Sequence, residues 1–114
     1  MGLRDFPDFI RNNPEVDIPF PGVRGWMIAG GRQQTVFVEF GADVDVPEHS
    51  HADQWELVIA GRAELFREDT TEIFESGDNF FVPAGQPHSA KVYKGYKALI
   101  VFDEPDRYSV KEEV

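Results

Sequence analysis

The chain has 114 residues and a formal net charge of −10, from 21 acidic and 11 basic side chains. Its length suits one domain with a single core, and so acidic a surface argues against nucleic-acid binding because it repels phosphates. The absence of cysteine excludes disulfides and thiolate chemistry, and no apolar run approaches the length of a membrane span. We therefore expect a cytoplasmic protein that binds neither nucleic acid nor membrane.

The N-terminal residues 1–25 predict a short irregular arm, because charged residues and prolines alternate there, with one helical turn near residues 8–12. The arm carries apolar side chains that have no obvious place in a barrel already rich in Phe: Phe6, Phe9, Ile10, Ile18 and Phe20. Packing them across an edge strand of a second copy would cover both the apolar side chains of the arm and the exposed strand edge. The arm thus predicts a homodimer.

Short strands are predicted along the rest of the chain, because Val, Ile and Phe are common, Leu is scarce, and Gly and Pro punctuate the sequence. Pro47 predicts an exposed edge or a bulge in its strand. We expect about eight to ten antiparallel strands in a sandwich or closed barrel, followed by an acidic, solvated tail over residues 105–114. The expected strands cover residues 25–30, 35–40, 42–51, 54–61, 62–69, 72–75, 79–82, 88–93 and 96–105.

The stretch "EHSHADQWE" at residues 48–56 holds two of the three histidines. If it is a strand, His49 and His51 share one face, because successive side chains point to opposite faces. Imidazole nitrogens suit transition metals such as Zn, Fe and Ni. His88 follows the turn "VPAGQP" and can converge with the pair. A His-x-His pair alone is weak evidence, since histidines on a surface or in a satisfied core are common.

Two longer stretches carry a family resemblance. "GADVDVPEHSHADQWELVIAG" (41–61) resembles the first cupin motif, and "GDNFFVPAGQPHSAKV" (77–92) resembles the second, with Val92 where the family has Asn. All three histidines occupy motif positions. The resemblance implies an all-β, antiparallel jelly-roll barrel over residues 26–104. It also implies one divalent transition metal (Fe, Zn, Mn or Ni) bound by His49, His51, His88 and a fourth side chain.

The identity of the fourth ligand depends on the direction of counting. Counting forward from His51, the family spacing reaches Glu56; counting back from Gly61, it reaches Gln54, where the family usually has Glu. We favour Gln54, because the strand before Gly61 has a fixed register whereas the loop after His51 tolerates insertions. Glu56 would then lie one step deeper on the same face, as a hydrogen-bond partner of a ligand or as a catalytic base.

The resemblance leaves the function open between two classes, because the fold hosts both. The first is a small metalloenzyme, an isomerase, lyase or dioxygenase, that acts on an oxygen-rich small molecule such as a sugar derivative or keto acid. The second is a non-catalytic module that binds or senses a small molecule in the same pocket. Gln54 cannot act as a base, so proton transfer would fall to Glu56, to a metal-bound hydroxide or to Glu39, although Glu39 is more simply read as a residue that faces solvent.

Overall fold

The computed structural model describes residues 5–111; residues 1–4 of the expected arm and 112–114 of the expected tail lie outside it. No helix within the described range is long and apolar enough to cross a membrane. One helical turn and ten strands were found in residues 5–111. In chain order they are α1 (Asp8–Arg11), β1 (Glu15–Val16), β2 (Val23–Gly30), β3 (Gln33–Phe40), β4 (Val44–His49), β5 (Gln54–Ala60), β6 (Arg62–Arg67), β7 (Thr70–Glu75), β8 (Asn79–Val82), β9 (His88–Val92) and β10 (Lys97–Phe102).

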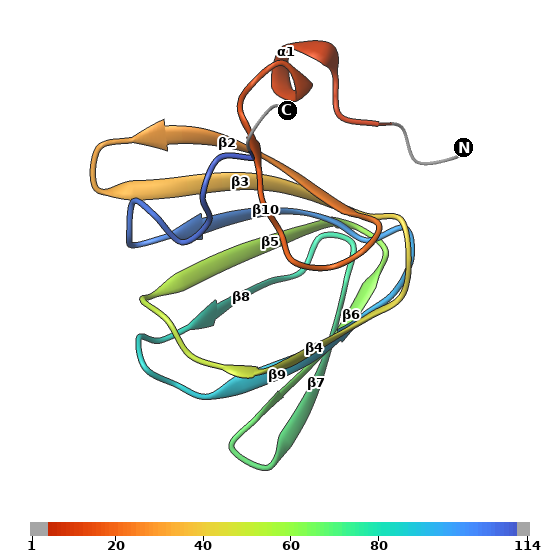
Figure 1. The fold of residues 1–114 in the computed structure, drawn as a ribbon. Helices are drawn as coiled ribbons and strands as arrows, with labels where there is room; N and C mark the ends of the chain where they lie inside the picture. The colour runs from red at the N-terminus through yellow and green to blue at the C-terminus, as the bar shows by residue number, and fades with distance from the viewer. Residues whose placement is uncertain (1–4, 112–114) are drawn as a thin grey trace.

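Two antiparallel sheets face each other (Figure 1). The larger has the order β1-β2-β3-β10-β5-β8, and the smaller has the order β4-β9-β6-β7. Strands that are distant in the chain are neighbours in each sheet, as β3 and β10 are, which is the pattern of a jelly roll. The all-β, antiparallel jelly-roll fold is therefore confirmed, and α1 confirms the predicted helical turn.

The core lies between the inner faces of the two sheets. Side chains alternate along each strand, so that β5 buries Gln54, Glu56, Val58 and Ala60 and turns the residues between them outward. The prediction that Gln54 and Glu56 share the inner face is thus confirmed. The apolar residues buried between the sheets include Val36, Val38, Val58, Ala63, Val92, Ala98, Ile100 and Phe102.

Gly61 marks the point where the chain leaves β5 in the large sheet and enters β6 in the small one. Its φ is +82°, a left-handed conformation that L side chains rarely adopt. A Cβ here would lie 2.6 Å from the Cα of Tyr96, so a side chain would push the backbone just before β10. The glycine therefore lets the two segments approach closely and places the Tyr96 side chain in the core, where it is 2% exposed.

The N-terminal arm packs on its own barrel. The Phe6 ring is buried and lies edge-on to Trp26 and Phe37 on the outer face of the large sheet, at 6.2 and 5.5 Å between centroids. Ile18 and Phe20 line the interior cavity described below. The expectation that these three side chains lack a place in their own barrel is therefore wrong. Phe9, in contrast, is 77% exposed.

Candidate metal centre

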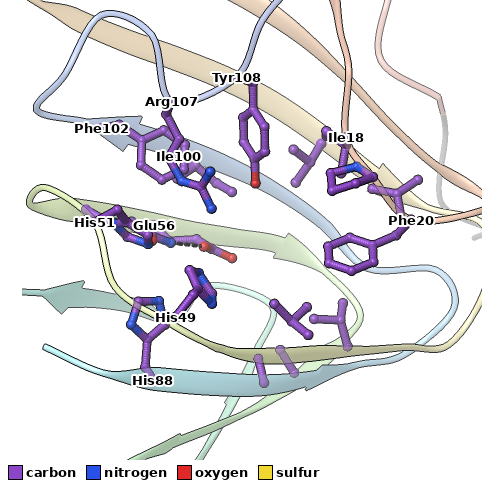
Figure 2. A pocket seen from close by; sticks show the side chains of 18 of the residues that line it. Ile18, Phe20, His49, His51, Glu56, His88, Ile100, Phe102, Arg107 and Tyr108 are labelled. Carbon is purple, nitrogen blue, oxygen red and sulfur yellow. Dashed lines mark hydrogen bonds between the residues drawn. The ribbon is translucent and has the colours of Figure 1, made fainter. Parts of the chain in front are cut away.

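The three histidines converge at one end of the space between the sheets (Figure 2). One ring nitrogen from each lies within 4.8 Å of those of the other two. The ring centroids are 4.3 Å apart for His49 and His88, 4.8 Å for His51 and His88, and 5.1 Å for His49 and His51. Three imidazoles this close can share one cation, as the sequence predicts.

Strand pairing brings His49 and His88 together. His49 ends β4 and His88 begins β9, and the two are Cα partners in the antiparallel ladder. The ladder is irregular between Val46 and His49, and β4 is an edge strand, so the expectation of an edge or bulge at Pro47 is confirmed. The bulge shifts the register so that the two histidines are opposite each other.

His51 reaches the cluster from a loop. Because β4 ends at His49, the strand expected through residue 51 is two residues too long, and alternation along a strand does not place the His51 side chain. The loop is held by the turn that precedes β9: the Gly85 N–H donates to the His51 carbonyl oxygen at 2.9 Å, and the Ala84 N–H donates to Asp53 Oδ1 at 2.6 Å. These bonds fix His51 relative to the turn that carries His88.

Each imidazole is oriented by a backbone carbonyl. In all three rings Nδ1 is the atom within hydrogen-bond distance of an oxygen, and a carbonyl oxygen only accepts, so Nδ1 carries the proton. A neutral ring then keeps its lone pair on Nε2, which is the arrangement that metal-ligating histidines use. The acceptors, for His49, His51 and His88 in turn, are the carbonyl oxygens of Pro47, Ala52 and Gln86 at 2.8, 2.8 and 2.9 Å.

The electrostatic environment also favours neutral imidazoles. Burial lowers the pKa of His51 and His88 below the ordinary value, because desolvation penalises the charged ring. Neutral rings are the form that binds metal. The donor set, three imidazole nitrogens with fixed tautomers, fits a divalent transition metal.

Gln54 and Glu56 form a buried hydrogen-bonded chain behind the histidines. Nε2 of Gln54 donates to Oε1 of Glu56 at 2.7 Å, and the Tyr96 hydroxyl donates to Oε2 of Glu56. Burial raises the pKa of Glu56 to about 7, although both hydrogen bonds favour the charged form. Burial and the neighbouring carboxyl raise the pKa of Tyr96, so its hydroxyl stays protonated.

Gln54 lies nearer the histidine end of the barrel than Glu56 does. In the ladder between β5 and β10, Gln54 is the Cα partner of Phe102, whereas Glu56 pairs with Ile100, one step deeper. The His51 ring packs edge-on against Phe102, at 5.5 Å between centroids. Register thus brings Gln54 level with the histidines.

The cluster opens into a cavity of about 770 Å³ between the sheets. Ala90 and Val92 on β9 face it, as alternation from His88 predicts. Gln54 and Glu56 line it together with mostly apolar side chains that include Ile18, Phe20, Leu65, Phe80 and Ile100. A cavity of this size is large enough for a small molecule.

Comparison with known proteins identifies the family. A sequence model of the Cupin domain (Cupin_2) matches residues 36–102, more than half of the chain. The chain belongs to the cupin family. No match was found among curated proteins.

Solved structures of other cupins share the fold. KdgF from Halomonas sp. is 25% identical with a TM-score of 0.67, over 81% of this chain and 86% of that one. An RmlC-like cupin from Shewanella frigidimarina is 23% identical with a TM-score of 0.73, over 94% and 96%. A W96Y oxalate decarboxylase from Bacillus subtilis is 19% identical with a TM-score of 0.70, over 84% of this cupin but 28% of that chain.

One residue that lines the cavity of this cupin is not indicated by any pattern in the sequence. Arg107 lies in the segment expected to be a solvated tail, yet it lines the cavity and its guanidinium points between Tyr108 and the histidines (Figure 2). It lies 4.6 Å from the centroid of the Tyr108 ring and 5.6 Å from that of Phe102. Its Nε is buried without a hydrogen-bond partner, and no ion pair within residues 5–111 involves it.

A buried amide anchors the Arg107 segment. Gln34 on β3 is 1% exposed; its Oε1 accepts from the Tyr108 N–H at 3.0 Å, and its Nε2 donates to the Tyr108 carbonyl oxygen at 2.9 Å. This two-point pairing attaches the chain after β10 to the large sheet. No short-range sequence signal indicates it, because the partners are 74 residues apart.

Proposed function

We propose that this cupin is a metal-dependent enzyme that acts on a small, oxygen-rich acid such as a keto acid or an acidic sugar derivative. The observation that carries the proposal is one cavity that combines a cluster of metal-ligating nitrogens with a cationic side chain. Three imidazoles with free Nε2 atoms line it, and so does the unpaired guanidinium of Arg107. A bound divalent ion at the histidines would act as a Lewis acid toward a substrate oxygen.

Arg107 supports the choice of an acid as substrate. A guanidinium presents a planar set of donors that matches a carboxylate in a bidentate pair. A buried donor without a partner is costly, so such groups are usually satisfied by a ligand or water. Asp17, Glu56 and Glu104 also line the cavity, yet Arg107 forms no ion pair with them, so its charge is available to an anionic ligand.

Glu56 is the candidate acid–base group. It lines the cavity, and its pKa of about 7 lies where a carboxyl can both accept and donate a proton near neutral pH. Gln54 is the proposed fourth ligand, because its register brings it level with the histidines. The Gln54 amide carries no charge and cannot act as a base, so the two neighbouring residues have separate roles.

Two measurements test this proposal on protein purified without a metal-affinity tag. Elemental analysis gives the metal content, and an activity screen tests keto acids and uronic acids as substrates. We expect about one equivalent of a divalent transition metal and turnover of at least one acid that stops when a chelator removes the metal. Manganese belongs in reconstitution trials beside iron, zinc and nickel, since the oxalate decarboxylase that shares the fold has Mn(II) centres. Binding of an acid without turnover would favour the non-catalytic binding module instead.

Metal affinity is expected to depend on pH in one direction. Protons compete with the metal for Nε2, and the pKa values of His51 and His88 are lowered, so both rings stay neutral to below the ordinary value of 6.5. We expect the affinity for Co(II) to vary little above about pH 6.5 and to fall steeply below it. Calorimetric titrations between about pH 5 and pH 8 measure this; an affinity that stays constant down to the lower limit contradicts the histidine site.

We also propose that the protein is a homodimer, through the outer face of the large sheet rather than through the arm. Ladder partners place one row of outward side chains across five strands: Ile28, Thr35, Val101, Trp55 and Phe81. Ile28, Trp55 and Phe81 are 46, 38 and 50% exposed. The row has no charge, so a second copy can cover it without bringing the acidic surfaces of two chains into direct apposition.

Light scattering at micromolar concentration tests the dimer. We expect twice the chain mass for the unmodified protein and the chain mass for Trp55→Glu combined with Phe81→Glu, because charges would then be buried in the interface. Ile73→Glu is the matched control, since Ile73 is 52% exposed but belongs to β7 of the small sheet. A monomeric unmodified protein would count decisively against the proposal.

A further inference from the structure

The geometry behind the histidines points to a positioning role for Glu56 and Tyr96: we infer that together they hold the Gln54 amide with its oxygen, not its nitrogen, toward the metal. The inference rests on the proposed metal function and deepens it. An amide is a useful ligand for a divalent cation only through its oxygen, because the NH₂ group donates and has no free lone pair. A glutamine ligand therefore needs a device that fixes its orientation.

The hydrogen-bonding capacities of the three groups provide that device. Nε2 of Gln54 donates to Oε1 of Glu56 at 2.7 Å, so the Gln54 group that faces Glu56 is the NH₂. Oε1 of Gln54 then faces away from Glu56, and no residue in the described range 5–111 donates a hydrogen bond to it. The side chain lines the cavity at the level of the histidines, so its free oxygen is available there.

Tyr96 fixes the other end of the chain. Its hydroxyl donates to Oε2 of Glu56, which leaves Oε1 to accept from Gln54. Tyr96 is 2% exposed, and the close approach of Gly61 to its backbone holds it in place. Tyr96 and Gln54 therefore both donate to Glu56, and reversing the Gln54 amide would set its carbonyl oxygen against a carboxylate oxygen.

Titration with Co(II), which binds nitrogen and oxygen ligands and has a visible spectrum, tests the inference in variants of equal charge. In Glu56→Gln the introduced amide has one acceptor oxygen, which the Tyr96 hydroxyl engages. Its NH₂ then faces Gln54 and turns the Gln54 oxygen away from the metal. We expect affinity for Co(II) to fall by about tenfold to a hundredfold. In Glu56→Gln combined with Tyr96→Phe, the introduced amide is free to rotate, and we expect most of the affinity to return.

The matched control is Glu64→Gln. Glu64 also accepts a tyrosine hydroxyl, that of Tyr93 at 2.6 Å, but it is absent from the cavity lining. Its replacement should leave Co(II) affinity unchanged. Undiminished affinity in Glu56→Gln would overturn the inference. Equal weakening in Glu56→Gln and in the double variant would also overturn it, because charge rather than orientation would then be the cause.

A metal-free measurement separates this inference from the proposed function. In the nuclear magnetic resonance spectrum of the apoprotein, one side-chain amide proton of Gln54 should exchange slowly with solvent, because it is bonded to Glu56. If the unmodified protein binds no Co(II), the metal proposal fails, while the exchange rate still decides the orientation. Fast exchange of both Gln54 amide protons would overturn the inference on its own.

Discussion

Replacing His88 with Ala is expected to remove the metal while the barrel stays folded. His88 is 5% exposed and is the Cα partner of His49, so its imidazole is central to the cluster. Its loss leaves two imidazole nitrogens at the site. We expect the affinity for the metal to fall by more than about 100-fold, a larger loss than replacing a hydrogen-bond partner of a metal ligand usually causes. Mass spectrometric metal analysis measures the content, and thermal unfolding followed by circular dichroism reports the fold.

Ser89→Ala is the control for His88→Ala. Ser89 is the next residue on β9 and is absent from the lining of the histidine cavity, so its replacement changes the strand but not the donor set. We expect unchanged metal content in this variant. Full metal occupancy in His88→Ala would show that the three histidines do not form the site.

Replacing Arg107 with Gln is expected to abolish the preference for acids over neutral molecules. Glucuronate and glucose are a suitable pair of probes, because they differ in one carboxylate. We expect the metal-loaded protein to bind glucuronate more tightly, and Arg107→Gln to weaken that binding by about tenfold to a hundredfold, the range of a charge-assisted hydrogen bond to a buried group. Binding of glucose and metal content should stay the same.

Two further variants separate the fork of donors in Arg107 from its charge. Arg107→Lys keeps the positive charge but loses the bidentate geometry, so we expect partial recovery of glucuronate binding. Arg32→Gln removes the same charge from the exposed end of the large sheet, where the side chain is 87% exposed, and should have no effect. Equal glucuronate binding by Arg107→Gln and the unmodified protein contradicts the proposed role.

The histidine cluster and the register of β5 could be predicted from the sequence because both depend on local patterns. Strand alternation alone places Gln54 and Glu56 on the inner face, and the motif spacing picks out His49, His51 and His88. Whether Gln54 or Glu56 is a ligand stays a prediction, for which register favours Gln54.

The parts that could not be predicted depend on irregular segments and distant contacts. Periodicity gives no signal for Arg107, because its position depends on the pairing of Gln34 with Tyr108. It also gives none for Phe6, whose site on Trp26 is formed by the fold as a whole. The hydrogen bond from Tyr96 to Glu56 joins residues 40 positions apart.

The anchoring of the Arg107 segment by Gln34 has a consequence for how this barrel can change its choice of ligand. The histidines are held by β4, β9 and the loops beside them, whereas Arg107 lies on the stretch of chain after β10, which Gln34 attaches to β3 and which pairs with β1 through the Val16–Val110 bridge. Capture of the ion and selection of the organic molecule are thus assigned to different pieces of the polypeptide. Exchange of residues 105–109 for a segment of another chemistry would retarget the pocket without disturbing the imidazoles, provided that the Gln34 contacts and the bond from the Ala52 N–H to Glu104 beside His51 are kept.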